Sequence, residues 1–94
     1  MRFDWDEAKN AANRKKHGIG FETAALVFDD PRHISILDRH VEGEERWQTL
    51  GRIGPFVVVM VAHVVKDIEG EEIIRIVSAR RATAHERRAY DQET

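Results

Sequence analysis

Four arginines cluster near the C-terminus, where a predicted strand is followed by a predicted helix. They belong to residues 78–90, which read SARRATAHERRAY. Arginine suits phosphate recognition because its planar guanidinium can donate two parallel hydrogen bonds. Because successive residues of a strand point to opposite faces of the sheet, Arg80 and Arg81 face opposite sides, and we do not expect them to have the same function. The helix that follows adds three further candidates for contact with a phosphate backbone, Arg87, Arg88 and Tyr90.

Three more candidates for phosphate chemistry lie on two predicted strands. Arg46 and Arg52 share one face of a strand because their separation is even. His63 lies among valines, where a histidine is more often a buried structural residue than a proton carrier. One titratable ring among several arginines is nevertheless what metal-free cleavage of RNA requires. RNA supplies its own nucleophile, the 2′-hydroxyl, so the protein needs only to orient the backbone, move a proton and stabilise charge on the phosphate oxygens.

Structural roles are the alternative for the same arginines. Arg80 or Arg81 could pair with a carboxylate such as Asp30 or Glu86, and solvent could surround the two helical arginines. A purely structural role for all four is the less favoured interpretation, because so many guanidinium groups gather in one short segment.

Metal or cofactor chemistry has little support in the sequence. The chain has no cysteine, and it contains no P-loop, dinucleotide-binding glycine turn, nucleophile elbow or HExxH helix. His33 and His40 are seven residues apart, and no third ligand has helical or hairpin spacing with them. We therefore expect no metal site and no cofactor.

Residue periodicity predicts the elements that position these side chains. Asp4 or Asp6 can cap a first helix, and Gly18 can end it. Thr83 and Glu86 form a capping box at the start of the last helix. The expected order is a helix within 4–18, a helix over 21–28, strands over 33–38, 46–53, 56–65 and 72–79, and a helix over 84–92.

This succession predicts an α+β fold with two N-terminal helices, a four-stranded antiparallel sheet and a C-terminal helix. The first helix is expected to dock through a narrow apolar stripe of Trp5, Ala8 and Ala12. The strand from Phe56 to Val65 is apolar on both sides, so we expect it to be central and covered on both faces.

Length and composition bound the class of protein. With 94 residues the chain is expected to form a single domain over residues 1–94. The longest apolar run, residues 56–62, is far too short to span a membrane. Acidic residues near the N-terminus occupy the place where a signal peptide is apolar. The absence of cysteine fits a reducing cytoplasm, which is the expected location.

The net charge of −2 conceals segregated blocks of charge. Residues 21–45 carry seven carboxylates against two arginines, whereas residues 73–90 carry five arginines against one glutamate. This asymmetry predicts a basic working surface and an acidic surface that serves a different partner.

Three segments of the chain resemble one protein family. Residues 5–18 fit W-D-E-x-K-x-x-x-N-x-x-K-H-G and are followed by Phe21 and Phe28. Residues 49–53 read TLGRI, and residues 78–87 fit S-A-R-x-A-x-x-x-E-R. Together these motifs resemble the BrnT family of type II toxins, a RelE-like group of small ribonucleases. The similarity covers nearly the whole chain, and its opening and closing motifs are specific in combination.

The resemblance implies a RelE-like sheet flanked by helices, and metal-independent cleavage of RNA that inhibits translation. It also implies neutralisation by a BrnA-type antitoxin that carries a DNA-binding domain, so that operator DNA is contacted only through the antitoxin. Trp5, Phe21 and Phe28 match the family and are expected to be core residues. Six candidate site residues also match it by position: Lys16, His17, Arg46, Arg80, Glu86 and Arg87. We expect catalysis by His17, Arg46, Arg80 and Glu86, with the general acid and base left open. We expect RNA binding by Lys16, Arg52, His63, Arg81, Arg87, Arg88 and Tyr90.

This chain is slightly acidic, whereas RelE-like toxins are usually basic. We therefore hypothesise that the acidic span, residues 22–45, or the strand edge beside it, faces the antitoxin or its basic segments. Reversal of Glu42, Glu44 and Glu45 to lysine tests this idea through antitoxin affinity. Two other functions fit the same residues: a non-catalytic arginine-rich module that acts only in a repressor complex, and a toxin that has kept its fold and partner but lost its activity.

Overall fold

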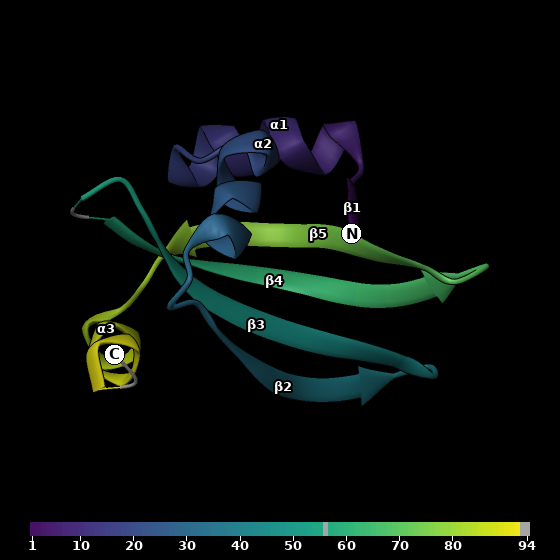
Figure 1. Cartoon of the computed structure of the whole chain (residues 1–94). Coiled ribbons are helices and arrows are strands. Elements are labelled where there is room, and N and C mark those ends of the chain that lie inside the picture. The colour runs from purple at the N-terminus through teal and green to yellow at the C-terminus, as the bar shows by residue number, and fades with distance from the viewer. Residues whose placement is uncertain (56, 93–94) are drawn as a thin grey trace.

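A five-stranded mixed sheet forms the centre of the computed structural model, which describes residues 1–55 and 57–92 (Figure 1). Its strands, in the order β1-β5-β4-β3-β2, are antiparallel to their neighbours except that β1 runs parallel to β5. They are β1 (Arg2–Asp4), β2 (Ile34–Val41), β3 (Glu44–Ile53), β4 (Val57–Ile68) and β5 (Glu71–Arg81). The helical elements are α1 (Glu7–His17), α2 (Phe21–Ala24), the 3₁₀ helix η1 (Ala25–Asp29) and α3 (Ala84–Gln92).

The predicted α+β class is confirmed, but the prediction of a four-stranded, purely antiparallel sheet is wrong. The fifth strand is β1, in which Phe3 pairs with Ile74 on the edge of β5. A three-residue segment is too short to show an alternating pattern, so its pairing depends on tertiary packing. The four predicted strands are present, and each extends beyond its predicted limit at one end or both, although β2 begins one residue later than predicted. The predicted start of the central strand at Phe56 lies outside the described residues.

Apolar side chains are buried on both sides of the sheet, as predicted for its central strand β4. On one side, Phe21, Ala24 and Val27 are fully buried against β4 and β5. On the other side, Tyr90 of α3 packs with Leu50, Val58 and Met60. The predicted second helix divides into α2 and η1, whose successive turns supply the first of these two clusters.

The predicted docking stripe of α1 is only partly correct, although the ends of the helix are as predicted. Trp5 is partly buried and packs against the core, whereas the two alanines of the stripe do not. Ala8 and Ala12 are exposed, and the buried residues of α1 are Asn10 and Asn13. The Asn10 side chain accepts a hydrogen bond from the Phe21 backbone N–H at 2.8 Å. A polar face docks this helix because its side-chain amides pair with backbone groups that would otherwise be buried without partners.

The close approach of η1 to β3 requires glycine at position 51. A Cβ there would lie 2.7 Å from both the Cβ and the carbonyl oxygen of Val27, which is fully buried. Because backbone must move to relieve this contact, we expect Gly51→Ala to lower the free energy of unfolding by about 1–3 kcal/mol, as overpacking usually does. Urea denaturation measures the loss. Gly20→Ala is the control, since its Cβ would meet no atom closer than 3.5 Å; equal losses in the two variants would contradict this explanation.

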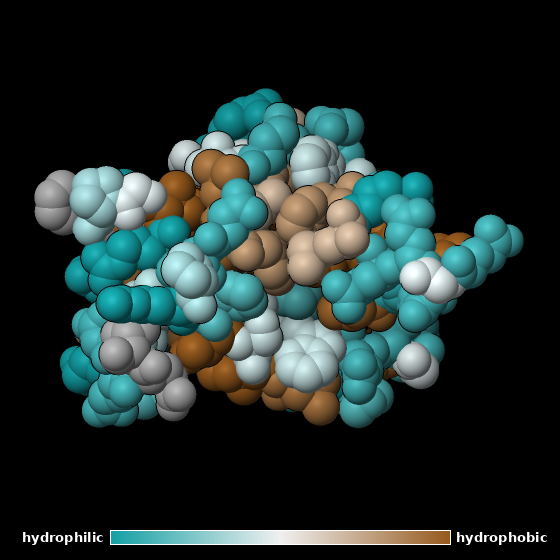
Figure 2. Space-filling view, in the orientation of Figure 1, coloured by the Kyte–Doolittle hydropathy of each residue, from teal (hydrophilic) through white to brown (hydrophobic). Residues whose placement is uncertain are grey.

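Opposite charges gather at opposite ends of the sheet. The β2–β3 and β4–β5 turns lie together at the right-hand end, where hydrophilic side chains cover the surface (Figures 1 and 2). We call this the acidic end; its carboxylates belong to Glu42, Glu44, Glu45, Asp67, Glu69, Glu71 and Glu72. Basic residues there are ion-paired: Arg2 with Glu71 at 3.6 Å and Lys66 with Glu44 at 3.2 Å. The C-terminal ends of α1 and β5 and the whole of α3 lie at the other end (Figure 1).

Candidate functional site

A shallow hollow of about 500 Å³ lies between the last turns of α1 and the C-terminal part of β5. It brings together three residues of the predicted site, Lys16, His17 and Arg80. Lys9 and Ser78 also line it. We call this the cationic hollow, because the charges of Lys9, Lys16 and Arg80 favour an anionic ligand.

Asn13 holds α1 beside β5 and so determines the shape of the cationic hollow. Its side-chain amide donates to the carbonyl oxygens of Ile19 and Ala79 at 2.8 Å each, and its Oδ1 accepts from the Ala79 N–H at 3.2 Å. Ala79 directly precedes Arg80, so these bonds set the position of Arg80 relative to the last turn of α1. The predicted site lacks Asn13; the available signal is its place in the W-D-E-x-K-x-x-x-N-x-x-K-H-G pattern.

We expect Asn13→Ala to lower the free energy of unfolding by about 2 kcal/mol. The change leaves the buried N–H and C=O groups of Ala79 without their partner, and unpaired buried polar groups are unfavourable. Urea denaturation measures the loss, and Lys15→Ala on the exposed side of the same helix is the control. An unchanged midpoint for Asn13→Ala would show that α1 is held by other contacts.

Arg80 is fixed by a two-pronged ion pair with Glu86. Its Nη1 and Nη2 donate to Oε1 and Oε2 of Glu86 at 2.8 and 3.1 Å. Glu86 also accepts from the Thr83 backbone N–H at 2.8 Å, and Thr83 Oγ1 accepts from the Glu86 N–H, so the predicted capping box is present. The bonds from Arg80 lower the pKa of Glu86, and the same bonds raise the pKa of Arg80. The guanidinium therefore remains charged and its direction is set by the start of α3.

Arg46 lies on the same face of the sheet as Arg80, two strands away. Arg80 pairs with Met60 and Arg46 pairs with Val64, and these two β4 residues share a face. Strand spacing puts the two arginine Cα atoms about 16 Å apart, since they are two strands apart across the sheet and four residues apart along it. Arg46 Nε is buried and has no hydrogen-bond partner within the described part of the chain. The two arginines are therefore separate contacts on one surface, not members of one cluster.

The remaining predicted arginines lie apart from the cationic hollow. Arg81 and Arg87 line a separate small depression of about 90 Å³, and Arg81 faces the opposite side of the sheet from Arg80, as strand alternation predicts. Arg52 donates to the Pro55 carbonyl at 2.9 Å and lies over the Tyr90 ring. Arg88 is exposed on α3.

Tyr90 and His63 are buried, so the structure gives neither a surface from which to bind RNA. Tyr90 belongs to the apolar cluster beneath α3, and its hydroxyl donates to Asp30 Oδ2. Burial and this hydrogen bond raise the pKa of Tyr90. His63 lies on the other face of the sheet from Arg80, and burial lowers its pKa to about 4. The imidazole is therefore neutral near pH 7.

No group of three or more His, Cys, Asp or Glu side chains is placed to hold a metal ion in residues 1–55 and 57–92. No helix within these same ranges combines the length and apolar character needed to cross a membrane. The fold and the cationic hollow together define a small α+β protein in which an arginine, two lysines and a histidine line one hollow.

Comparison with known protein families gives a more specific assignment than this structural class. Residues 5–86 match the family described as the ribonuclease toxin, BrnT, of type II toxin–antitoxin systems. Because the match spans most of the 94 residues, the chain belongs to the BrnT family, and the resemblance predicted from the sequence is confirmed. Membership of a type II system implies an antitoxin as partner. A search of the curated proteins gives no match.

Proposed function

We propose that this chain is an active, metal-independent endoribonuclease whose catalytic site is the cationic hollow. The arrangement of Arg80 carries this proposal. Glu86 fixes its guanidinium at the rim of a hollow that also contains Lys16 and His17. A guanidinium whose direction is fixed before RNA binds stabilises charge on a phosphate without a further ordering cost.

Cleavage of RNA by attack of its own 2′-hydroxyl requires that the backbone is oriented, that a proton is moved and that charge on the phosphate is stabilised. We assign these three tasks to residues of the cationic hollow. The 2′ oxygen loses its proton and attacks the adjacent phosphorus, while the 5′ oxygen leaves with a proton, giving 2′,3′-cyclic phosphate and 5′-hydroxyl ends. Arg80 and Lys16 stabilise the charge that grows on the phosphate oxygens. His17 is the residue of the hollow that can exchange a proton. Glu86 is a positioning residue, and Arg46 contacts a neighbouring phosphate along the same sheet face.

The biological setting follows from the family and extends this proposal. Cleavage of RNA in the cytoplasm would inhibit translation, and a BrnA-type antitoxin would neutralise the chain. The DNA-binding domain of that antitoxin would bring the complex to its operator, so the chain itself would not contact DNA. The proposed toxin acts as a single domain over residues 1–94.

Cleavage of a defined RNA in the presence of EDTA tests the proposal. We expect products with 2′,3′-cyclic phosphate ends, and no cleavage at a position where a single 2′-deoxynucleotide removes the nucleophile. Binding that weakens steeply with salt, without any cleavage, would instead favour the non-catalytic arginine-rich module. Failure both to bind and to cleave RNA would favour a toxin that has lost its activity.

A further inference from the structure

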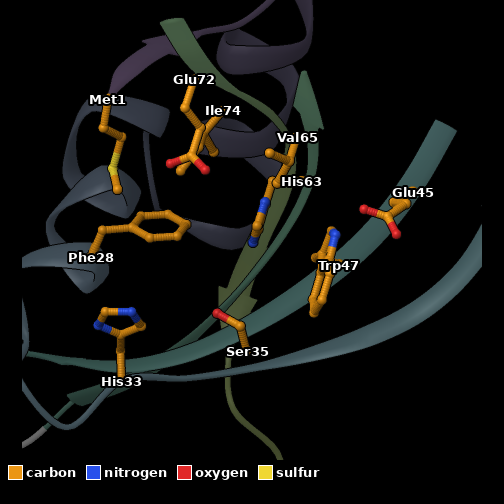
Figure 3. Close-up of a pocket in the computed structure, with 10 residues that line it drawn as sticks. All are labelled: Met1, Phe28, His33, Ser35, Glu45, Trp47, His63, Val65, Glu72 and Ile74. Atoms are coloured by element: carbon orange, nitrogen blue, oxygen red, sulfur yellow. The ribbon is translucent and has the colours of Figure 1, made fainter. Parts of the chain in front are cut away.

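A second cavity, of about 380 Å³, opens on the face of the sheet opposite Arg80, beside the acidic end (Figure 3). Phe28 of η1 and Trp47, Val65 and Ile74 of three strands supply apolar walls. The His63 ring stands between the rings of Phe28 and Trp47. Phe28 meets it edge to face at 5.1 Å, so the aromatic lining is contiguous. We call this the aromatic pocket.

Two nitrogen atoms in the lining of the aromatic pocket are buried without a hydrogen-bond partner in the described residues, Trp47 Nε1 and His63 Nδ1. His63 is only 4% exposed, and its other nitrogen, Nε2, is already bonded to Thr49 Oγ1 at 2.7 Å. The indole N–H can only donate. By contrast, the other indole, that of Trp5, donates to Glu7 Oε1 at 2.7 Å. Buried polar atoms are normally paired, so an occupant that brings an acceptor to Trp47 is favoured.

The charge around the aromatic pocket selects the kind of occupant. Glu45 and Glu72 line the pocket and lie on either side of the His63 ring (Figure 3). Phosphate groups are repelled by this end of the molecule, which disfavours an RNA base as the occupant. A polypeptide segment with an apolar side chain between lysine or arginine residues complements both the walls and the margin.

We propose that the aromatic pocket binds such a segment of the antitoxin, with a carbonyl oxygen of the segment accepting the Trp47 N–H. Only the identity of the partner as an antitoxin rests on the proposed toxin function. Because Arg80 faces the side of the sheet opposite the aromatic pocket, and none of the described residues lines both the pocket and the cationic hollow, the segment leaves Arg80 uncovered. A peptide of this segment alone therefore binds without blocking RNA cleavage, and a different part of the antitoxin must cover the hollow.

Nuclear magnetic resonance of the ¹⁵N-labelled full chain tests this directly, since its two tryptophans give separate indole signals. The probes are overlapping synthetic peptides that cover the sequence of the antitoxin partner. We expect one peptide, with an apolar residue between basic ones, to shift the Trp47 indole signal downfield and slow its exchange with water. The Trp5 signal should stay in place. If the whole antitoxin binds and the Trp47 signal does not move, or if an RNA oligonucleotide moves it instead, the proposal is wrong.

Charge-reversal variants distinguish binding at the aromatic pocket from a general effect of the negative charge of the acidic end on antitoxin affinity. We expect Glu45→Lys combined with Glu72→Lys to weaken antitoxin binding by about tenfold or more. The matched control is Glu42→Lys with Glu69→Lys, which makes the same charge change at two exposed turn positions outside the pocket. Equal weakening by both pairs, or none by either, would overturn the proposal. Because the readout is affinity and not RNA cleavage, an inactive ribonuclease would leave the test intact.

Discussion

Arg80→Ala is expected to reduce RNA cleavage by the purified chain about 100- to 1000-fold, the usual effect of removing one group that stabilises charge in a transition state. Arg80 is held by Glu86, and among the described residues that line the cationic hollow it is the one arginine. Single-turnover cleavage of a labelled RNA measures the loss. Circular dichroism and thermal unfolding establish that the variant is folded, and a folded Arg80→Ala chain with full activity would contradict the assignment of the site.

Two further substitutions test whether cleavage depends on the positive charge of Arg80 or on the orientation of its guanidinium group. Arg80→Lys keeps the positive charge but loses the fork that binds both oxygens of Glu86, so we expect only partial activity. Glu86→Gln keeps an acceptor for the Thr83 N–H and weakens the hold on Arg80. A positioning role predicts that it lowers kcat more than it raises KM. Arg39→Ala, at an exposed arginine of β2 that belongs to no predicted site, is the control and should change cleavage little.

The part of the site that is local in sequence could be predicted. Thr83 and Glu86 are three residues apart, and their reciprocal bonds follow from the rules of helix capping. Arg80 and Arg81 diverge because successive strand residues point to opposite faces, and this too follows from sequence. The bond of Arg80 to Glu86 is the structural role that the sequence allows as the alternative for this arginine, and the structure shows it. The phosphate contact of Arg80 stays a prediction.

The long-range part of the site could not be predicted. The hollow exists because Asn13 bonds to Ala79, 66 residues away, and a periodicity argument treats a buried asparagine as a solvent-facing position. Helical periodicity likewise predicts a docking face of Trp5, Ala8 and Ala12, of which Trp5 packs against the core and the two alanines are exposed. For His63, burial could be predicted from the sequence but its position relative to Arg80 could not. Its valine neighbours indicate a buried ring, and the sequence could not reveal that its face of the sheet is opposite that of Arg80.

Burial of His63 predicts that the chain loses stability as the pH falls from about 6.5 to 4. Its pKa in the folded chain is lowered to about 4, whereas a histidine in an unfolded chain titrates near 6.5. Between these values the unfolded state binds the additional proton, so the free energy of unfolding decreases as the pH is lowered. The two pKa values correspond to a total loss of about 3 kcal/mol from this one residue.

Urea denaturation at a series of pH values, for the natural chain and His63→Gln, isolates this contribution. Glutamine cannot titrate, and its side-chain amide can replace the imidazole in the hydrogen bond to Thr49 Oγ1. We expect the variant to be less stable at pH 7 but to lose much less stability between pH 6.5 and 4.5 than the natural chain. The carboxylates with lowered pKa, Asp30 and Glu86 among them, titrate in both proteins and cancel in the comparison. Identical pH profiles would mean that His63 is protonated within the folded chain, and that water or an acidic side chain reaches its free nitrogen.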